Sequence, residues 1–551
     1  MPSDRQHTTV RRFLSLVVRV LLVASTLVLG LLSLPGGRWP LLALVSLVPL
    51  GLALHNSSRT ECFVYAYACG FLGWIASTGG LIGGLSSYSR ISSGAAAALV
   101  VLACAGLALP YGAFGLLYGR FRWMAGRRGA LKTAACLTVL LSFFPSPLPL
   151  DSSHALYGFP LLVQILDLGG QPLLLFTLFL INWLLVDLVL RISQYRNYWS
   201  TAFWIASICA LVVGYGYFRL ARLHAEEVRA TRDRVLRVAL IQPNIPLEGD
   251  SNPHSPDSLN PFHTLLDQSV YLFATGQQMD LVVWPETPIR INCEDDSGSL
   301  RPEISAIVAR YGVPFLINCA QPAEGGKEYN TQLLITPSGR TYAYHKQIRF
   351  PFTEYVPGER WLPELKTLLP GASQYAAASE STVLPVKDSL EVFPAICYEI
   401  LFPGQTREFV RRGGNVMISP ANDAWFGKTR IPEFEIAEGT YQAVQYRIPI
   451  VRVSNSGNSV AISASGEIVS GSRTPAFTKA TRVVEVVVPW TRAPYFFVGD
   501  SFLYALALSW SFSVVADSLQ KRKVSQHESG GRGSRTAKAL RPIYDDESLR
   551  S

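Results

Sequence analysis

Three residues whose types together suit acyl transfer follow strand-like segments of the chain. The thiol of Cys397 lies in Phe-Pro-Ala-Ile-Cys-Tyr-Glu-Ile, the carboxylate of Glu286 follows Val-Val-Trp-Pro, and the ammonium of Lys346 follows Tyr-His. A thiol becomes a strong nucleophile when a base removes its proton, and a cation stabilises the oxyanion that forms on an attacked carbonyl. Cys397 is thus a candidate nucleophile, Glu286 a base and Lys346 an oxyanion stabiliser. Residue types alone leave open a structural cysteine, a solvated lysine and a capping glutamate.

These residues need a layered domain to bring them together. Residues 235–490 contain short apolar runs that alternate with polar segments and with helical stretches near 301–310 and 435–447. The candidate strands are Val235–Gln242, Leu281–Trp284, Phe315–Asn318, Gln332–Ile335, Phe393–Ile396, Val416–Ser419, Ile450–Ser454 and Val460–Ser463. Continuous apolar strands between helices indicate a sheet covered on both faces, and therefore an α/β or α+β domain.

The rest of the chain is too apolar for a wholly soluble protein. Of 551 residues, 49% are hydrophobic and only 16% are charged, and long apolar runs predict membrane-spanning helices. We expect spans near 13–34, 40–55, 62–85, 94–118, 131–149, 171–190, 199–218 and 496–516. The expected organisation is a seven-span bundle (1–218), a linker (219–234), the layered domain (235–490), a C-terminal span (496–516) and a disordered cytoplasmic tail (517–551).

The distribution of basic residues predicts the orientation of these spans. The N-terminus and the loops 119–132 and 191–196 are basic, whereas loop 150–170 has no Lys or Arg. By the positive-inside rule the N-terminus is cytoplasmic, and seven spans then place residues 235–490 on the opposite side. The net charge is +9, and the basic residues lie mostly beside hydrophobic runs. This placement indicates membrane topology rather than nucleic-acid binding.

The eight cysteines show neither a C-x-x-C motif nor a Cys/His cluster, so we expect no metal site. Most of them lie in apolar stretches. Cys293 and Cys319 lie in the polar region and could form a disulfide if that region is extracytoplasmic.

The sequence around the three candidate residues resembles the nitrilase (carbon–nitrogen hydrolase) superfamily. The resemblance rests on Trp-Pro-Glu-Thr, on Lys346 with Glu354 eight residues later, and on Cys397-Tyr398-Glu399, in that order. Matching segments flank them: Ile-Gln-Pro-Asn (241–244), Ser-Pro-Ala-Asn-Asp-Ala-Trp-Phe-Gly (419–427), Arg452 and Ser-Asn-Ser-Gly (454–457). The resemblance implies an α-β-β-α sandwich over about 235–490 and a Glu-Lys-Cys triad.

Spans before and after such a domain resemble the apolipoprotein N-acyltransferase family. That resemblance implies that Cys397 takes an acyl chain from a phospholipid as a thioester and passes it to the amino group of a diacylglyceryl-cysteine in an apolipoprotein. It also implies a monomeric enzyme without a cofactor, located in the bacterial inner membrane with its catalytic domain on the periplasmic side.

Further residues match family positions with open roles. Glu354 is expected near the triad, or paired with Arg349 or Arg360; Tyr398 follows the nucleophile, and Glu399 has either a site role or a structural salt bridge. Trp425 and Phe426 could cover an acyl groove or pack in the core.

The chain also departs from the family pattern. Ile-Pro-Glu-Phe-Glu (431–435) stands where many members carry Pro-His-x-His, so the roles of Glu433 and Glu435 stay open. Thr353 replaces a common Gly, and segment 244–260 has no Trp. These departures affect the preference for donor and acceptor rather than the triad.

Two alternatives belong to other functional classes. A membrane-tethered amidase would hydrolyse a small amide, but one or two spans would suffice to anchor it. A transporter with a degenerate sensor domain would need ionisable residues at mid-membrane, whereas Arg19, Asp187 and Asp500 lie near the ends of predicted spans.

Overall fold

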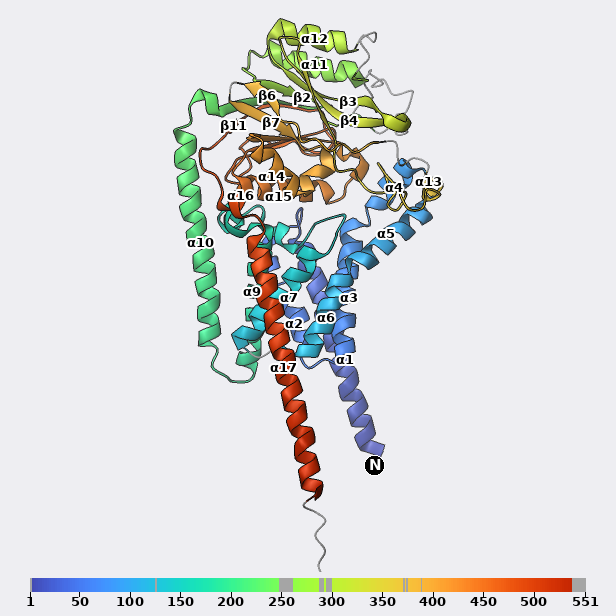
Figure 1. The fold of residues 1–551 in the computed structure, drawn as a ribbon, viewed down its shortest axis with the longest axis vertical. Coiled ribbons are helices and arrows are strands. Elements are labelled where there is room, and N and C mark those ends of the chain that lie inside the picture. Colours follow the sequence, from blue (N-terminus) through green and yellow to red (C-terminus); the bar gives the residue numbers. More distant parts are fainter. Residues whose placement is uncertain are drawn as a thin grey trace, which may run out of the picture.

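The computed structural model divides into a helical bundle and a two-sheet sandwich stacked on one end of it (Figure 1). It describes the whole chain except residues 1, 124–125, 247–260, 287–291, 294–299, 370–371, 373–374, 388 and 538–551. The first helix, α1 (Pro2–Ser33), begins at the end of the bundle that is remote from the sandwich, and the last helix, α17 (Ser501–Ala537), ends there.

The bundle contains most of the helices. They are α1 (Pro2–Ser33), α2 (Val48–Leu54), α3 (Arg59–Thr78), α4 (Leu81–Ser89), α5 (Ser93–Leu107), α6 (Leu109–Phe121), α7 (Gly126–Phe143), α8 (Pro160–Val163), α9 (Leu166–Ser193), α10 (Trp199–Val228) and α17 (Ser501–Ala537). Within the described residues, five helices are long and apolar enough to cross a membrane, or six if the bent pair α3 and α4 is one span.

Proline and glycine explain where the helices differ from the predicted spans. The span predicted over 40–55 is a 3₁₀ turn (Pro40–Leu44) followed by the short α2, and α7 ends at Phe143, ahead of Pro145. A residue that precedes proline is disfavoured in the helical conformation. Gly79 and Gly80 separate α3 from α4, which are bent by 58°. Conversely, α17 runs on to Ala537, into the range predicted to be a disordered tail.

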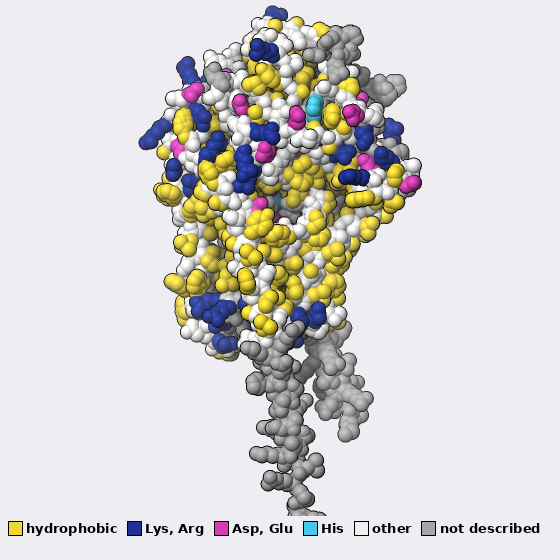
Figure 2. All heavy atoms as spheres, viewed as in Figure 1, with side chains coloured by type: hydrophobic (Ala, Val, Ile, Leu, Met, Phe, Trp, Pro, Cys, Tyr) yellow, Lys and Arg dark blue, Asp and Glu magenta, His cyan; other side chains and the backbone are white. Residues whose placement is uncertain are grey.

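The surface of the bundle is that of a membrane protein. Hydrophobic side chains cover the helical half of the molecule, whereas charged side chains gather on the sandwich and at the far end of the helices (Figure 2). Large apolar side chains such as Leu21, Leu211 and Phe512 are exposed. A surface this apolar is stable where lipid rather than water surrounds it.

The sandwich contains a six-stranded and a five-stranded sheet. The strand orders are β11-β1-β2-β3-β4-β5 and β10-β9-β8-β7-β6. The first sheet comprises β1 (Val235–Gln242), β2 (Leu281–Val283), β3 (Phe315–Ala323), β4 (Lys327–Ile335), β5 (Thr341–His345) and β11 (Ala480–Val487). The second comprises β6 (Leu384–Lys387), β7 (Leu390–Pro394), β8 (Val416–Ala421), β9 (Ile450–Ser454) and β10 (Val460–Ile462).

Helices cover the outer faces of both sheets and complete an α-β-β-α sandwich. Leucines and valines of the two sheets form one shared core between them. Helices α11 (Pro261–Ala274) and α12 (Leu300–Tyr311) cover the first sheet, and α14 (Pro403–Arg411) and α15 (Ile431–Tyr446) lie between the second sheet and the bundle (Figure 1). The remaining short helices are α13 (Leu365–Leu368) and α16 (Pro494–Val498).

Buried ion pairs join the bundle to the sandwich. Arg447, which follows α15, contacts Asp167 of α9 at 2.5 Å, and Arg219 of α10 contacts the same carboxylate at 2.7 Å. Nearby, the imidazole of His154 contacts Glu438 of α15 at 2.9 Å. Because a buried charge that loses its partner is costly, these pairs fix how the two parts dock.

Candidate active site

Cys397 lies on a sharp turn that follows β7. It begins a short 3₁₀ helix (Cys397–Leu401), and its φ of +53° lies in the left-handed region. A non-glycine residue there is strained, and such strain concentrates at functional sites. The Cys397 side chain lines a cavity of about 500 Å³.

Glu286, Lys346 and Glu354 meet beside this thiol in the same cavity. The Lys346 ammonium donates hydrogen bonds to Oε1 of Glu286 at 3.0 Å and to Oε1 of Glu354 at 2.9 Å. Glu286 follows β2 and Lys346 follows β5, so the edge of one sheet supplies both. Glu354 also accepts the backbone N–H of Phe350 at 2.7 Å. The structure therefore pairs Glu354 with Lys346 rather than with Arg349 or Arg360.

Asn330 is a polar neighbour of the triad that sequence reasoning missed. Its side-chain amide donates to Oε1 of Glu286 at 2.8 Å, and Asn318 donates to Asn330 at 2.8 Å. Asn318 of β3 pairs with Gln332, and Asn330 of β4 pairs with Ala320. Both asparagines are far from Glu286 in sequence, so no local motif connects them to it. Together with Lys346, Asn330 occupies one carboxylate oxygen of Glu286 and thereby orients the carboxylate.

Burial and charge set the resting protonation of the site. Burial raises the pKa of the Cys397 thiol well above its usual value, and the Glu286 and Glu435 carboxylates raise it further, against the opposing effect of Lys346. Burial alone would lower the pKa of Lys346, but Glu286 and Glu354 outweigh it and raise that pKa. The resting site thus holds a neutral thiol beside a charged ammonium, so that attack by Cys397 requires a base.

Glu399 organises the backbone rather than lining the cavity. Its carboxylate accepts backbone N–H groups from Gln347 (2.7 Å), Ile348 (3.0 Å) and Ile396 (2.8 Å), and the hydroxyl of Tyr344 (2.9 Å). It therefore ties the segment after Lys346 to the segment before Cys397, in place of the structural salt bridge considered from sequence.

The aromatic residues near Cys397 have different positions: some pack against neighbouring side chains, and some line the cavity. Tyr398 packs edge-on against Phe350 and donates its hydroxyl to the Pro147 carbonyl of a bundle loop. Trp425 and Phe426 both line the cavity, and Phe426 is also packed against the ring of Phe350. Phe426 therefore both lines the cavity and packs in the core beside it.

The two glutamates that depart from the family pattern have different partners. Glu435 contacts Arg452 at 2.5 Å, and Arg452 also pairs with Asp423 at 2.7 Å. Burial raises the pKa of Glu435 to about 7. Glu433 instead pairs with Arg473 at 2.6 Å and accepts the hydroxyl of Tyr157, at the junction with the bundle.

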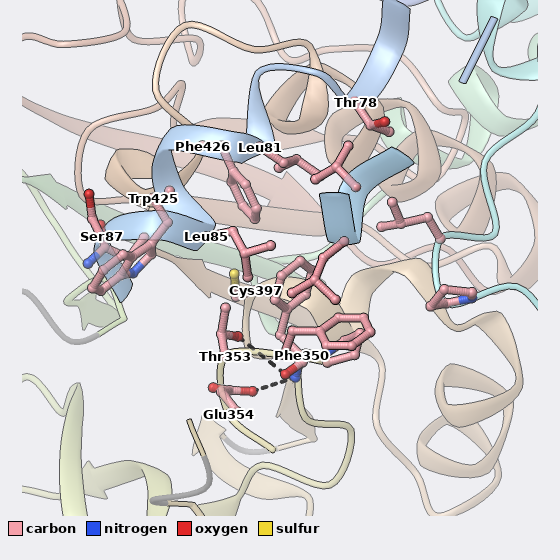
Figure 3. A pocket seen from close by; sticks show the side chains of 18 of the residues that line it. Thr78, Leu81, Leu85, Ser87, Phe350, Thr353, Glu354, Cys397, Trp425 and Phe426 are labelled. Carbon is pink, nitrogen blue, oxygen red and sulfur yellow. Dashed lines mark hydrogen bonds between the residues drawn. The ribbon is translucent and has the colours of Figure 1, made fainter. Parts of the chain in front are cut away.

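Helices of the bundle form the opposite wall of the cavity. Figure 3 shows Leu81 and Leu85 of α4 over the Cys397 sulfur, with Thr353 and Glu354 on its other side. One face of α5 continues this wall with Leu99, Val100, Ala103 and Leu107. The cavity therefore lies between the sandwich and apolar helices of the bundle.

Small residues allow α4 to approach the sandwich closely. A Cβ on Gly84 would lie 2.1 Å from the carbonyl oxygen of Trp425, and one on Gly80 would lie 2.4 Å from Cγ2 of Thr429. The hydroxyl of Ser89, at the end of α4, donates to the Phe352 carbonyl at 2.7 Å. These contacts hold α4 against the loops that surround Cys397.

The sandwich and its Glu-Lys-Cys arrangement define a class of protein: residues 237–493 match the carbon–nitrogen hydrolase family. Residues 27–184 match a second family, described as the apolipoprotein N-acyltransferase N-terminal domain. The chain belongs to the apolipoprotein N-acyltransferase family of the nitrilase superfamily.

Curated relatives carry the name of this family. The apolipoprotein N-acyltransferase of Geobacter metallireducens is 27% identical over 67% of this chain and 69% of its own length. The apolipoprotein N-acyltransferase of Chlorobaculum tepidum is 30% identical over 40% of this chain and 46% of its own length. Apolipoprotein N-acyltransferase 1 of Treponema pallidum is 31% identical over 42% of this chain and 46% of its own length. The chain thus spans about half the length of the latter two.

Solved nitrilase-superfamily structures align with half of the chain. Nit3 of Saccharomyces cerevisiae is 16% identical, with a TM-score of 0.37, over 49% of this chain and 97% of its own. An amidase from Nesterenkonia sp. is 17% identical, with a TM-score of 0.35, over 50% of this chain and 97% of its own.

Within the described residues, no group of three or more His, Cys, Asp or Glu could hold a metal ion.

Proposed function

We propose that this protein transfers a fatty acyl chain from a phospholipid, through a thioester on Cys397, to the N-terminal amine of diacylglyceryl-cysteine in apolipoproteins. One observation carries the proposal: the cavity that contains Cys397, Glu286 and Lys346 has the apolar helices α4 and α5 as its opposite wall. Such a wall suits substrates whose acyl chains reside in lipid. A small-amide hydrolase would not need it.

The geometry accommodates two successive acyl transfers. In the first, Glu286 takes the proton of the Cys397 thiol, and the sulfur attacks the ester carbonyl of the phospholipid. The Lys346 ammonium stabilises the oxyanion. The lysophospholipid then leaves with the proton from Glu286, and the acyl chain stays on sulfur.

The second transfer uses the same residues. The acceptor amine attacks the thioester carbonyl, Lys346 again stabilises the oxyanion, and Glu286 receives the proton that the amine loses. The thiolate leaves, Cys397 recovers its proton, and the product is an amide. The thioester keeps the acyl group activated between two bulky substrates.

We also propose a multi-pass protein of the bacterial inner membrane, monomeric, with residues 235–490 on the periplasmic side. Two observations support this orientation. Cys293 and Cys319 form a disulfide, which persists in oxidising compartments, and α1 begins and α17 ends at the opposite end of the bundle. A periplasm-dependent reporter fused after residue 490 should be active; an inactive reporter would refute the orientation.

Mass spectrometry of the purified protein incubated with phospholipid tests the reaction. An acyl adduct should form on Cys397 and be absent from Cys397→Ala. Cys209→Ala, which removes an exposed cysteine of α10, should keep the adduct and serves as the matched control. If the wild type forms no adduct and releases ammonia from small amides, the protein is an amidase and the proposed acyltransferase function is wrong.

A further inference from the structure

Arg90 occupies a fixed position on the rim of the reactive cavity. It caps the C-terminus of α4 with a left-handed φ of +53°, and it lines the same cavity as Cys397. The adjacent residue Ser89 is bonded to Phe352, and Ser86 donates its hydroxyl to the Ile91 carbonyl at 2.8 Å. The backbone on both sides of Arg90 is therefore anchored, while its side chain is exposed.

The charges around the cavity leave one cation available. The charged residues that line it are Arg90, Glu286, Lys346 and Glu354. Lys346 is committed to both carboxylates, at 3.0 and 2.9 Å. The Arg90 backbone N–H donates to the Ser86 carbonyl, but within the described part of the chain its side chain has no hydrogen-bond or ion-pair partner. A guanidinium without a partner, in the lining of the cavity that contains the Cys397 thiol, suits an anionic group of a substrate.

The proposed acyl donor supplies such a group. In a glycerophospholipid only the glycerol backbone separates the acyl ester from the phosphate, so a phosphate enters the cavity whenever the ester reaches Cys397. The acyl chain would lie along the apolar face of α5. A guanidinium binds phosphate oxygens through two parallel, charge-assisted hydrogen bonds.

We propose that Arg90 binds the phosphate of the acyl donor and thereby makes the enzyme select phosphorylated over neutral acyl lipids. This inference rests on the proposed function, because it concerns the first acyl transfer. It assigns to Arg90 a role in substrate binding, separate from the chemistry at Cys397.

The test compares two donors with identical acyl chains, a phospholipid and a diacylglycerol, by the rate of adduct formation on Cys397. With phospholipid, Arg90→Gln should react about 10- to 100-fold more slowly than the wild type, as expected for a lost hydrogen-bonded charge. With diacylglycerol the two should react equally, and Arg90→Lys should be intermediate with phospholipid. Arg482→Gln, an exposed arginine of β11 outside the cavity lining, is the matched control.

Equal rates of Arg90→Gln and wild type with phospholipid would overturn the inference, as would equal slowing with both donors at unchanged thermal stability. A wild type that forms no adduct with either lipid would instead overturn the proposed function.

Inorganic phosphate, added as a competitor to the wild type and to Arg90→Gln, distinguishes free phosphate from lipid phosphate as the bound anion. Inhibition of the wild type alone indicates that free phosphate also occupies the site, and inhibition of neither protein restricts the site to lipid phosphate. Equal inhibition of both proteins contradicts a phosphate site at Arg90.

Discussion

In the proposed reaction, activation of the Cys397 thiol depends on Glu286. The pKa of Cys397 is raised by burial and by neighbouring carboxylates, so the thiolate is scarce at neutral pH. We expect Glu286→Gln to slow formation of the acyl adduct at pH 7 by about 10²- to 10⁴-fold, the usual contribution of a general base. Rapid-quench mass spectrometry measures this rate.

The matched control for this substitution is Glu303→Gln. Glu303 is an exposed residue of α12, and its replacement should leave the rate unchanged. If Glu286→Gln acylated at the wild-type rate, another group would have to deprotonate Cys397.

The sequence predicted the individual residues of the site better than the contacts among them. Glu286, Lys346, Glu354 and Cys397 stand in short local motifs, and the structure brings all four together. Asn330 carries no such motif, and its contact with Glu286 depends on how β3 and β4 pair in the folded sheet. The backbone-binding role of Glu399 likewise depends on two loops that meet only in the folded domain.

Among the elements, α4 depends on glycines for its close approach to the sandwich. Gly84→Ala would place a methyl group against the Trp425 carbonyl, 2.1 Å away. We expect α4 to shift and adduct formation on Cys397 to slow by at least tenfold, since misplacement of about 1 Å can cost a hundredfold in rate.

Gly83 provides a control on the same helix. A Cβ there would meet no atom within 4 Å, and alanine is favoured over glycine in a helix by about 1 kcal/mol. Gly83→Ala should therefore keep the wild-type rate. Equal rates for the two variants would mean that the contact between α4 and Trp425 does not matter for acylation.

The disulfide joins the segment that follows β2 to β3. Cys293 also donates its backbone N–H to the Ala320 carbonyl at 2.9 Å, and Cys319 precedes that residue. We expect the double variant Cys293→Ser, Cys319→Ser to lose about 2–4 kcal/mol in free energy of unfolding, measured by thermal denaturation in detergent.

A reductant separates this loss from other effects of the two serines. It should lower the melting temperature of the wild type and leave that of the double variant unchanged. A wild type that is insensitive to reductant, with its thiols found free, would contradict the disulfide and weaken the periplasmic assignment.

The sequence predicts both ends of β1, whose hydrophobic pattern is continuous, but only the middle of α9 and the start of α10. Helix α9 extends beyond the predicted range 171–190 at both ends, and α10 continues to Val228, past the predicted end at 218. The pattern was less informative where the chain bends within an apolar run. The run over 62–85 contains the break at Gly79 and Gly80, and hydropathy does not record the direction in which a helix turns. For this reason α4 was expected as the end of a span, and its place over Cys397 was not foreseen.

For the molecule as a whole, His154 offers a pH-dependent measure of how the bundle and sandwich dock. Burial alone would lower the pKa of His154, but hydrogen bonds to Asp151 and Glu438 raise it to about 10. A group whose pKa is higher in the folded state stabilises the folded protein. For His154 this stabilisation is complete below the pKa of histidine in the unfolded chain, about 6.5. It is lost as the pH rises through the pKa of His154 in the folded protein.

We therefore expect His154→Gln to be less stable than the wild type by about 3 kcal/mol at pH 6, as for a broken buried ion pair, with the difference shrinking towards pH 10. Thermal denaturation across this pH range provides the measurement. His263→Gln, a substitution of an exposed histidine on α11, should show no such trend. A constant difference between wild type and His154→Gln would indicate that His154 is uncharged in the folded protein.

The wall that α4 and α5 contribute to the cavity bears on whether the acyl group passes to an amine or to water. An isolated fragment of residues 235–490 would keep Glu286, Lys346 and Cys397 but lose Leu81, Leu85 and the α5 face that oppose them. Bulk water would then reach the thioester from that side. In the proposed reaction, the membrane helices would therefore shield the thioester from solvent as well as anchor the domain. The fate of the acyl group would then depend on residues outside 235–490.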